Sequence, residues 1–458
     1  MTSAEAPDQS GLPDRWWEHA SGVVRYSFKW DGLTLRDVLA DLDDVERWGF
    51  DAIELFAPYH GGTEYYGLDP IDFYEVDPAI GTESDLRELL SAAHERGIAM
   101  IAFFNLGYAA EEFPPFLAAC DDVREGRDSE VAGWFRWSQT GEETPKSPLA
   151  PHFMNDGDHH WEYSERAEGY YYVKWEGIED DAALPQFDFS DPGWRAECER
   201  VVRHWMDYGF DGMIVDAVNW YLDCDWERNE THITGPIHDY PNSYSQPEGA
   251  GGFGDDPVPW IRRGGYTSVQ DYAFNCWWSD HDVFGDAIEN QDASVVEDAL
   301  QEYRDRVVAA GGVTYIGPHS PADRSRPERL LEIATIATVG ELFHEDGELF
   351  DLDWPESDLE RARELVRTLR GTPALQAAGD RTRIETENPA LYAFTRTSVT
   401  GEDHAFVALN YRADSIDASI DFDEPVSLRD CLTGERRGPV DILDLSLGPY
   451  EYRLYEME

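Results

Sequence analysis

Residues 208–221 read YGFDGMIVDAVNWY, and this stretch decides the fold class of the chain. Gly209 ends an amphipathic segment, and the run FDGMIVDAV that follows is almost entirely apolar, which is typical of a strand buried on both faces. One carboxylate, Asp216, lies near the end of this run. Burying a carboxylate is costly unless it is paired or neutralised, so Asp216 either takes part in chemistry or caps the next helix.

The same unit of helix, glycine and apolar strand occurs three times. Apolar residues recur at helical spacing in 34–48, 82–96 and 192–208, and the strands that follow are GFDAIELFAPY, GIAMIAFFN and FDGMIVDAV. Thr82 is placed to cap the second helix and Gly97 to end it. Such alternation predicts a parallel sheet covered on both faces, and the length of the chain favours a closed eight-stranded α/β barrel.

The pattern changes after about residue 375. Short alternating segments follow one another there, separated by turn residues: ALYAFTRTS, HAFVALNYRA, SIDASIDF and LGPYEYRLYEM. Alternation of polar and apolar residues indicates strands with one buried face. We therefore expect an antiparallel β-sandwich at the C-terminal end.

The charge composition excludes several classes of partner. The chain has 458 residues and a formal net charge of −58, from 36 Lys and Arg against 94 Asp and Glu, and its only lysines are Lys29, Lys146 and Lys174. Nucleic acids and anionic membranes require a basic surface, so neither is expected as a partner. The acidic residues are spread along the whole chain, a pattern that resembles proteins of salt-accumulating haloarchaea, and we expect a high-K⁺ environment.

Other signals are mostly absent from the sequence. Five widely spaced cysteines without a C-x-x-C pair indicate neither a disulfide framework nor a zinc site, and we expect no metal. The single G-x-G-x-x-G match, GAGGFG at 249–254, has no strand pattern before it, so no dinucleotide cofactor is expected. No targeting segment and no apolar window of membrane-spanning length is present, which predicts a soluble cytoplasmic protein.

Six stretches carry a resemblance to a known family. In chain order they are DRWWEHASGVVRYSFKWDG, LDDVERWGFDAIELFAPY, YYGLDPIDFYEVDPAIGTESDLRELLSAAHERGIAM, GYYYVKW, LPQFDFSDPGWRAECERVVRHWMDYGFDGMIVDAVN and NPALYAFTRTS. Together they resemble the alpha-amylase family, glycoside hydrolase family 13, in the branch of oligo-glucosidases and trehalose synthases. The resemblance implies a (β/α)8 TIM barrel from 1–108 and 191–372, a B-like insertion at 109–190 and a C-terminal β-sandwich at 373–458.

The resemblance also implies catalytic residues. Asp216 matches the family's nucleophile, and the acid/base would be Asp286 or Glu289 in VFGDAIENQD. These two point to opposite faces if 284–289 is a strand, so at most one faces the barrel mouth. Asp323 would replace a third carboxylate, because Ser320 stands at the expected position. Ile214 replaces an arginine that keeps the nucleophile ionised in the family.

These matches imply a glycoside hydrolase or transglycosidase that acts on α-linked sugars by a retaining mechanism, with an oligosaccharide or glycan as its partner. The alternative is an inactive barrel that binds a glycan or serves as a scaffold, which the missing arginine favours. Matching positions also imply a set of substrate-binding residues, namely Tyr59, Asp69, Tyr108, Asn219, Trp220, His319 and Arg324.

Overall fold

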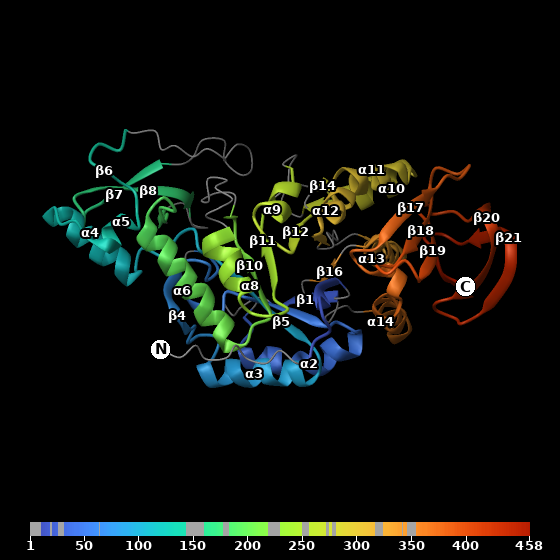
Figure 1. Ribbon diagram of the computed structural model, residues 1–458, viewed down its shortest axis with the longest axis horizontal. Helices are drawn as coiled ribbons and strands as arrows, with labels where there is room; N and C mark the ends of the chain where they lie inside the picture. The colour runs from blue at the N-terminus through green and yellow to red at the C-terminus, as the bar shows by residue number, and fades with distance from the viewer. Residues whose placement is uncertain are drawn as a thin grey trace.

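The computed structural model describes residues 11–18, 21–25, 32–63, 65–142, 160–176, 183–218, 230–249, 256–271, 274–276, 281–316, 324–340, 342–345 and 354–458. At its centre, eight parallel strands form one sheet (Figure 1). In their order across this sheet the strands are β11 (Tyr244–Pro247), β10 (Gly212–Val215), β5 (Ala99–Phe104), β2 (Ala52–Phe56), β1 (Ser21–Arg25), β16 (Leu342–Glu345), β15 (Val313–Ile316) and β12 (Ser268–Gln270).

The two ends of this sheet meet, so the sheet is a closed barrel. Thr267, just before β12, donates its backbone N–H to the carbonyl of Ser245 in β11 at 3.1 Å. The backbone N–H of Ser245 donates in return to Thr267 Oγ1 at 2.8 Å. The predicted (β/α)8 TIM barrel is confirmed.

Helices connect the barrel strands and cover their outer faces. They are α2 (Leu35–Trp48), α3 (Glu83–Glu95), α6 (Pro192–Tyr208), α8 (Gly235–His238), α9 (Val258–Arg262), α10 (Val283–Asn290), α11 (Ser294–Glu302), α12 (Arg304–Ala310), α13 (Arg326–Val339) and α14 (Glu356–Gly371). A π-helical turn, Glu230–Thr234, precedes α8. The helices expected at 34–48, 82–96 and 192–208 are confirmed as α2, α3 and α6.

Local sequence signals explain where these three helices begin and end. Thr34 and Thr82 each form a capping box with an aspartate three residues later, which satisfies backbone donors that the first turn leaves open. Gly49 and Gly209 follow α2 and α6 in the left-handed conformation, which ends the helix. After each of these helices the chain enters a fully buried strand, so the helices and strands alternate as the sequence predicts.

A separate layer is inserted between β5 and α6. It contains α4 (Pro114–Glu125), α5 (Glu130–Gly133), β6 (Trp137–Ser138), β7 (His160–Ser164), β8 (Gly169–Glu176) and β9 (Ala183–Pro185). The chain leaves and re-enters the barrel side by side, because Ala109 N–H donates to the carbonyl of Pro185 and Phe187 N–H to that of Gly107. A small hairpin, β3 (Tyr59–Gly61) and β4 (Pro70–Val76), follows β2, and β13 (Asn275–Cys276) pairs with β14 (His281–Asp282).

The C-terminal part is an antiparallel sheet in the order β17 (Asp380–Ile384), β18 (Leu391–Thr397), β19 (His404–Asn410), β22 (Tyr452–Met457), β20 (Ile416–Asp430) and β21 (Arg436–Leu447). Tyr392 and Val407 on one face belong to the barrel core, whereas Phe406 packs with Leu443 and Leu445 in a second core. Two packed layers of strands result, which confirms the predicted sandwich. Figure 1 places this sandwich and the insertion at opposite ends of the long axis.

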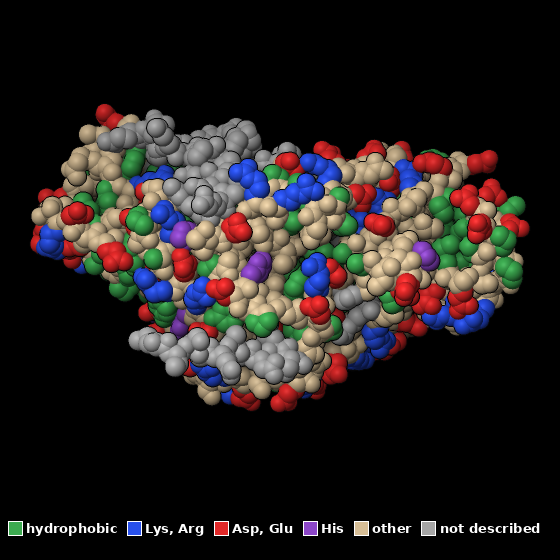
Figure 2. Space-filling model, in the orientation of Figure 1, with side chains coloured by type: hydrophobic (Ala, Val, Ile, Leu, Met, Phe, Trp, Pro, Cys, Tyr) green, Lys and Arg blue, Asp and Glu red, His purple; other side chains and the backbone are tan. Residues whose placement is uncertain are grey.

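Acidic side chains cover the surface broadly. Figure 2 shows Asp and Glu over the visible face from the insertion to the C-terminal sandwich, interspersed with basic side chains. Within the described ranges, no helix is long and apolar enough to cross a membrane. The domain boundaries, the high-salt environment and the cytoplasmic location stay predictions.

Candidate active site

Asp216 lies at the carboxyl end of β10, where the chain turns sharply. Its backbone N–H donates to the carbonyl of Phe104 at the end of the neighbouring strand β5, at 2.8 Å. Ala217 then adopts a left-handed conformation, with φ of 45°. Only 8% of Asp216 is exposed, so the barrel mouth contains a buried carboxyl group, as barrels of this fold use for their sites.

A second carboxyl group, that of Glu248, lies beside it. Glu248 directly follows β11, the strand next to β10, and its backbone N–H donates to the carbonyl of Val215 at 2.8 Å. Its Oε2 accepts the backbone N–H of Ala217 at 3.0 Å. One backbone N–H therefore ties the Glu248 carboxylate to the residue that follows Asp216, and the two carboxyl groups form a pair at the mouth of the barrel.

Two causes raise the pKa of Asp216 and one lowers it. Burial raises its pKa well above the ordinary value, and the negative charge of Glu248 raises it further. A hydrogen bond from Tyr108 Oη to Asp216 Oδ2, at 3.2 Å, favours the charged form and lowers the pKa.

Tyr108 and Tyr59 lie near Asp216, and Asp69 lies near both tyrosines; their role in substrate binding stays a prediction. Burial raises the pKa of both tyrosines, and the charges of Asp216 and Asp69 raise it further, so all four groups lie within electrostatic range. Tyr59 Oη donates to the carbonyl of Leu68 at 3.2 Å, which fixes the ring beside the loop that carries Asp69. Asp69 Oδ1 accepts the backbone N–H of Tyr65 at 3.2 Å and is fully buried.

Ile214, two residues before Asp216, is buried in β10. Strand β10 therefore places no cation two residues before Asp216, as expected from the sequence. The prediction that Asp216 lies at the carboxyl end of a barrel strand agrees with its observed place after β10.

The expected positions of Asp286 and Glu289 were based on a strand, and that strand assignment is wrong. Residues 283–290 form helix α10, and both carboxylates are exposed on its outer face. The reason is local: Asp282 caps this helix by accepting the N–H of Gly285 at 2.8 Å. The helical spacing then turns Phe284 and Ala287 inward. The structure therefore brings Glu248, and neither of these two, beside Asp216.

Arg324 is buried at the contact between α10 and α13. Its guanidinium pairs with Asp282 and, at 2.5 Å, with Glu332, and it lies over the ring of Phe284. Arg324 thus forms its ion pairs with Asp282, which caps α10, and with Glu332 of α13. Asn219, Trp220, His319 and Asp323 lie outside the described residues.

Glu248 is hard to recognise from the sequence because strand β11 has the unusual sequence YSQP. Polar Ser245 and Gln246 interrupt the apolar run that marks the other barrel strands. The sequence signal that could have indicated Glu248 is its position: it follows the short segment YSQP, precedes a glycine-rich stretch, and lies about one helix-and-strand unit after Asp216. Within the part of the chain that the structure describes, no group of three or more His, Cys, Asp or Glu is placed to hold a metal ion.

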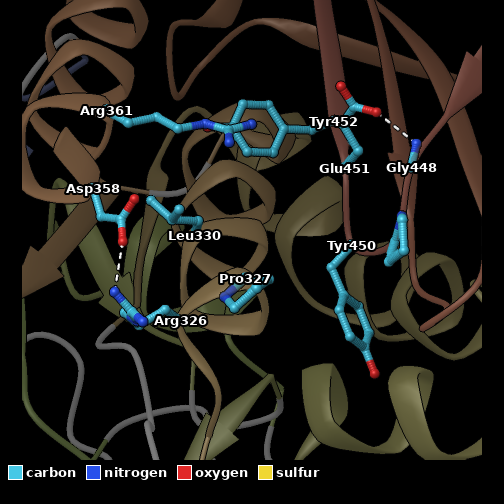
Figure 3. A pocket seen from close by; sticks show the side chains of 10 residues that line it. Arg326, Pro327, Leu330, Asp358, Arg361, Gly448, Tyr450, Glu451 and Tyr452 are labelled. Atoms are coloured by element: carbon cyan, nitrogen blue, oxygen red, sulfur yellow. Dashed lines mark hydrogen bonds and ion pairs between the residues drawn. The ribbon is translucent and has the colours of Figure 1, made fainter. Parts of the chain in front are cut away.

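A pocket of about 370 Å³ lies elsewhere, between α13, α14 and the turn from β21 to β22 (Figure 3). Arg326 pairs with Asp358 on its wall, and Arg361 lies over the ring of Tyr452. None of the lining residues is a carboxylate of the barrel mouth. The pocket is therefore separate from the candidate active site.

Comparison with known proteins agrees with this architecture. Residues 26–249 match the family model described as alpha amylase, catalytic domain. An alpha-glucosidase of Pediococcus pentosaceus is 27% identical over 212 residues, which is 45% of this chain and 36% of that protein. A trehalose synthase/amylase of Mycolicibacterium smegmatis is 27% identical over 209 residues, 44% of this chain and 33% of that protein.

The fold is shared over a greater length. The solved structure of Amy13B from Eubacterium rectale superposes with a TM-score of 0.77 at 16% identity and covers 96% of both chains. Barrel, insertion and C-terminal sandwich thus follow the amylase architecture. The region 26–249 matches the catalytic domain of the alpha-amylase family, and it ends one residue after Glu248 and so contains both carboxyl groups of the pair. The sequence matches span about a third of the length of the two curated relatives.

Proposed function

We propose that this protein is a retaining glycoside hydrolase or transglycosidase that acts on α-linked sugars, with Asp216 as nucleophile and Glu248 as acid/base. The observation that carries the proposal is the pair itself: two carboxyl groups at the ends of adjacent strands, joined through the backbone N–H of Ala217. Retaining glycosidases require two carboxyl groups about 5 Å apart on either side of the scissile bond. The proposal replaces Asp286 and Glu289 as acid/base.

The reaction would proceed in two displacements. In the first, an oxygen of Asp216 attacks the anomeric carbon, the glycosidic C–O bond breaks, and the proton of Glu248 passes to the leaving oxygen. In the second, Glu248 takes a proton from water or from an acceptor sugar hydroxyl, whose oxygen displaces Asp216. Tyr108 supports the first step because its hydrogen bond favours the ionised form of Asp216.

Substrate contacts complete the proposal. Tyr59, Asp69 and Tyr108 are substrate-binding candidates among the described residues, and all three are buried. The remaining substrate-binding candidates, Asn219, Trp220 and His319, stay predictions, as does Asp323 as third carboxylate. Arg324 would act from a distance, through its contacts with α10 and α13.

A substrate screen with matched variants tests the proposal. Purified protein in about 2–3 M KCl, which screens the acidic surface, is assayed against aryl α-glycosides and α-linked disaccharides. Asp216→Asn and Glu248→Gln should each abolish turnover, whereas Glu289→Gln, an exposed carboxylate of α10, should retain it. Silence of the folded wild-type protein across the panel would favour the inactive glycan-binding barrel, and full activity of Glu248→Gln would remove Glu248 from the mechanism.

A further inference from the structure

An asparagine at the end of β5, Asn105, joins two loops at the mouth of the barrel. It directly follows β5 and is fully buried. Its Nδ2 donates to the carbonyl of Leu68 at 2.7 Å and to that of Tyr108 at 2.9 Å. Its Oδ1 accepts the backbone N–H of Gly107 at 2.7 Å. One side chain therefore connects the loop between β3 and β4 to the loop that follows β5.

These three bonds fix the orientation of the Asn105 amide. The nitrogen faces two carbonyl oxygens, which can only accept, and the oxygen faces an N–H, which can only donate. Neither a turned amide nor a carboxylate of the same size can form these bonds, because an oxygen would then face both carbonyls. The position requires two donors and one acceptor, which the asparagine amide provides.

The loop that contains Leu68 is closely packed, so a bond to its carbonyl also fixes Asp69. The carbonyl of Leu68 accepts Tyr59 Oη in addition to the Asn105 amide. The backbone N–H of Gly62 donates to the carbonyl of Asp69 at 2.6 Å, and a Cβ atom on Gly62 would lie 2.1 Å from Asp69 Oδ2. Asp69 thus lies against the backbone of Gly62, which leaves this loop little room to rearrange.

The second loop leads directly to Asp216. Tyr108, whose carbonyl accepts from Asn105, donates its hydroxyl to Asp216 Oδ2 at 3.2 Å. The backbone N–H of Asp216 donates to the carbonyl of Phe104, the residue before Asn105. These contacts form a closed circuit that begins and ends at the carboxyl end of β5. The place of the Tyr108 hydroxyl relative to Asp216 therefore depends on the Asn105 amide.

We propose that Asn105 is a positioning residue for the nucleophile, whose amide holds Tyr108 at hydrogen-bond distance from Asp216 and fixes the loop that carries Asp69. The inference rests on the proposed function, because it takes Asp216 as the nucleophile. The hydrogen bond from Tyr108 favours the ionised form of Asp216, so a displaced Tyr108 leaves more of the nucleophile protonated. Removing the Asn105 amide should therefore weaken the same step as removing the Tyr108 hydroxyl.

The C-terminal sandwich contains a matched control, Asn410. It is likewise fully buried, and its Nδ2 donates to the carbonyls of Asp414 at 2.9 Å and Gly448 at 2.7 Å. Its Oδ1 accepts the N–H of Arg412, two residues on, at 3.0 Å, and Asn105 Oδ1 also accepts the N–H two residues on. Asn105→Ala and Asn410→Ala thus remove three bonds of the same kind, but only the first removes them at the barrel mouth.

The pH profile of kcat/KM separates positioning from stability. Both alanine variants should be destabilised to a similar extent. Only Asn105→Ala should lower kcat/KM, on the order of 100-fold, and move the acid limb to higher pH. Glu248 after β11 and Tyr59 of β3 are the other titratable groups of the described residues that act on Asp216, and both side chains remain in this variant. An acid limb that stays in place, or an equal loss of activity in Asn410→Ala, overturns the inference.

A double variant tests whether Asn105 acts through Tyr108. Tyr108→Phe removes the hydroxyl itself, so adding Asn105→Ala to it should move the acid limb no further, because both changes remove one hydrogen bond to Asp216. Additive shifts of the limb would contradict this route and overturn the inference. Asn105→Leu and Asn410→Leu, which keep more of the side-chain volume, serve the same comparison if the alanine variants do not fold.

Hydrogen exchange provides a readout that does not depend on activity. The N–H of Gly107 is bonded to Asn105 Oδ1, and that of Gly62 to the carbonyl of Asp69. Peptides with these glycines should exchange about tenfold faster in Asn105→Ala than in wild type, and at the wild-type rate in Asn410→Ala. Unchanged exchange in Asn105→Ala overturns the inference. A wild type with protected loops but without turnover on any α-glycoside refutes the proposed function, and with it the catalytic role of Asn105.

Discussion

Replacing Glu54, a buried residue of strand β2, by glutamine should stabilise the protein in alkaline solution. The unfolded chain releases the Glu54 proton near the ordinary pKa of 4.5, whereas the folded protein releases it near 8. Between these values the folded state binds more protons than the unfolded state, so stability falls as the pH rises. The whole difference corresponds to about 5 kcal/mol at about 1.36 kcal/mol per pKa unit.

The window from pH 5.5 to 8.5 contains most of this loss. The wild-type protein should lose about 3 kcal/mol of unfolding free energy there relative to Glu54→Gln, because only the wild type titrates at this position. Urea unfolding at constant high KCl measures both proteins, and urea leaves the ionic strength unchanged. Other titrating groups are common to both proteins and cancel in the difference.

An exposed carboxylate provides the control for this experiment. Glu289→Gln removes an exposed carboxylate from the outer face of α10 and so controls for the loss of one negative charge from the protein. If the curves of wild type and Glu54→Gln run parallel from pH 5.5 to 8.5, Glu54 ionises normally in the folded protein, and the reasoning from its burial is refuted.

Three further predictions concern other parts of the molecule. Tyr108→Phe removes the hydrogen bond that lowers the pKa of Asp216, so the acid limb of the pH profile of kcat/KM should move to higher pH. Tyr163→Phe, at an exposed tyrosine, is the control. An acid limb that does not move in Tyr108→Phe would contradict this role of Tyr108. Arg381→Met leaves the buried carboxylate of Glu297 without its arginine at the sandwich contact and should cost about 3–5 kcal/mol. Arg383→Met, whose partner Glu385 is exposed, should cost about 1 kcal/mol or less; equal costs would disprove the assignment. Dialysis to about 50 mM salt should unfold the protein, as seen by circular dichroism, because the net charge of −58 is then poorly screened; a stable fold there would refute the high-salt interpretation.

Those parts of the fold with local signals could be predicted from sequence. Thr34 and Thr82 begin helices by capping, and Gly209 ends one, so α2, α3 and α6 follow from short-range rules. The apolar run before Asp216 likewise indicates β10. In these segments the residues that set the structure lie within a few positions of it.

The acid/base could not be found in this way. Strand β11 is polar in sequence and is formed through its pairing with β10, where Ile214 lies opposite Gln246, so its register depends on a distant segment. Segment 284–289 contains apolar residues close together that are also compatible with a strand, whereas the spacing of Phe284 and Ala287 and the capping residue Asp282 belong to a helix. Glu54 was hidden for a third reason, since one acidic residue within an apolar strand does not reveal its partner Tyr315, 261 positions away.

The stereochemistry of azide rescue tests the central claim about Asp216 and Glu248 most directly. With an aryl α-glycoside whose leaving group needs no proton, Glu248→Ala still forms the glycosyl-enzyme on Asp216, and azide then displaces Asp216 to give the α-azide. In Asp216→Ala, azide attacks the substrate itself and gives the β-azide. Proton NMR of the anomeric hydrogen distinguishes the two products. Opposite anomers from the two variants are the predicted result, and the same anomer from both, or no azide product from an otherwise active protein, would contradict the assignment.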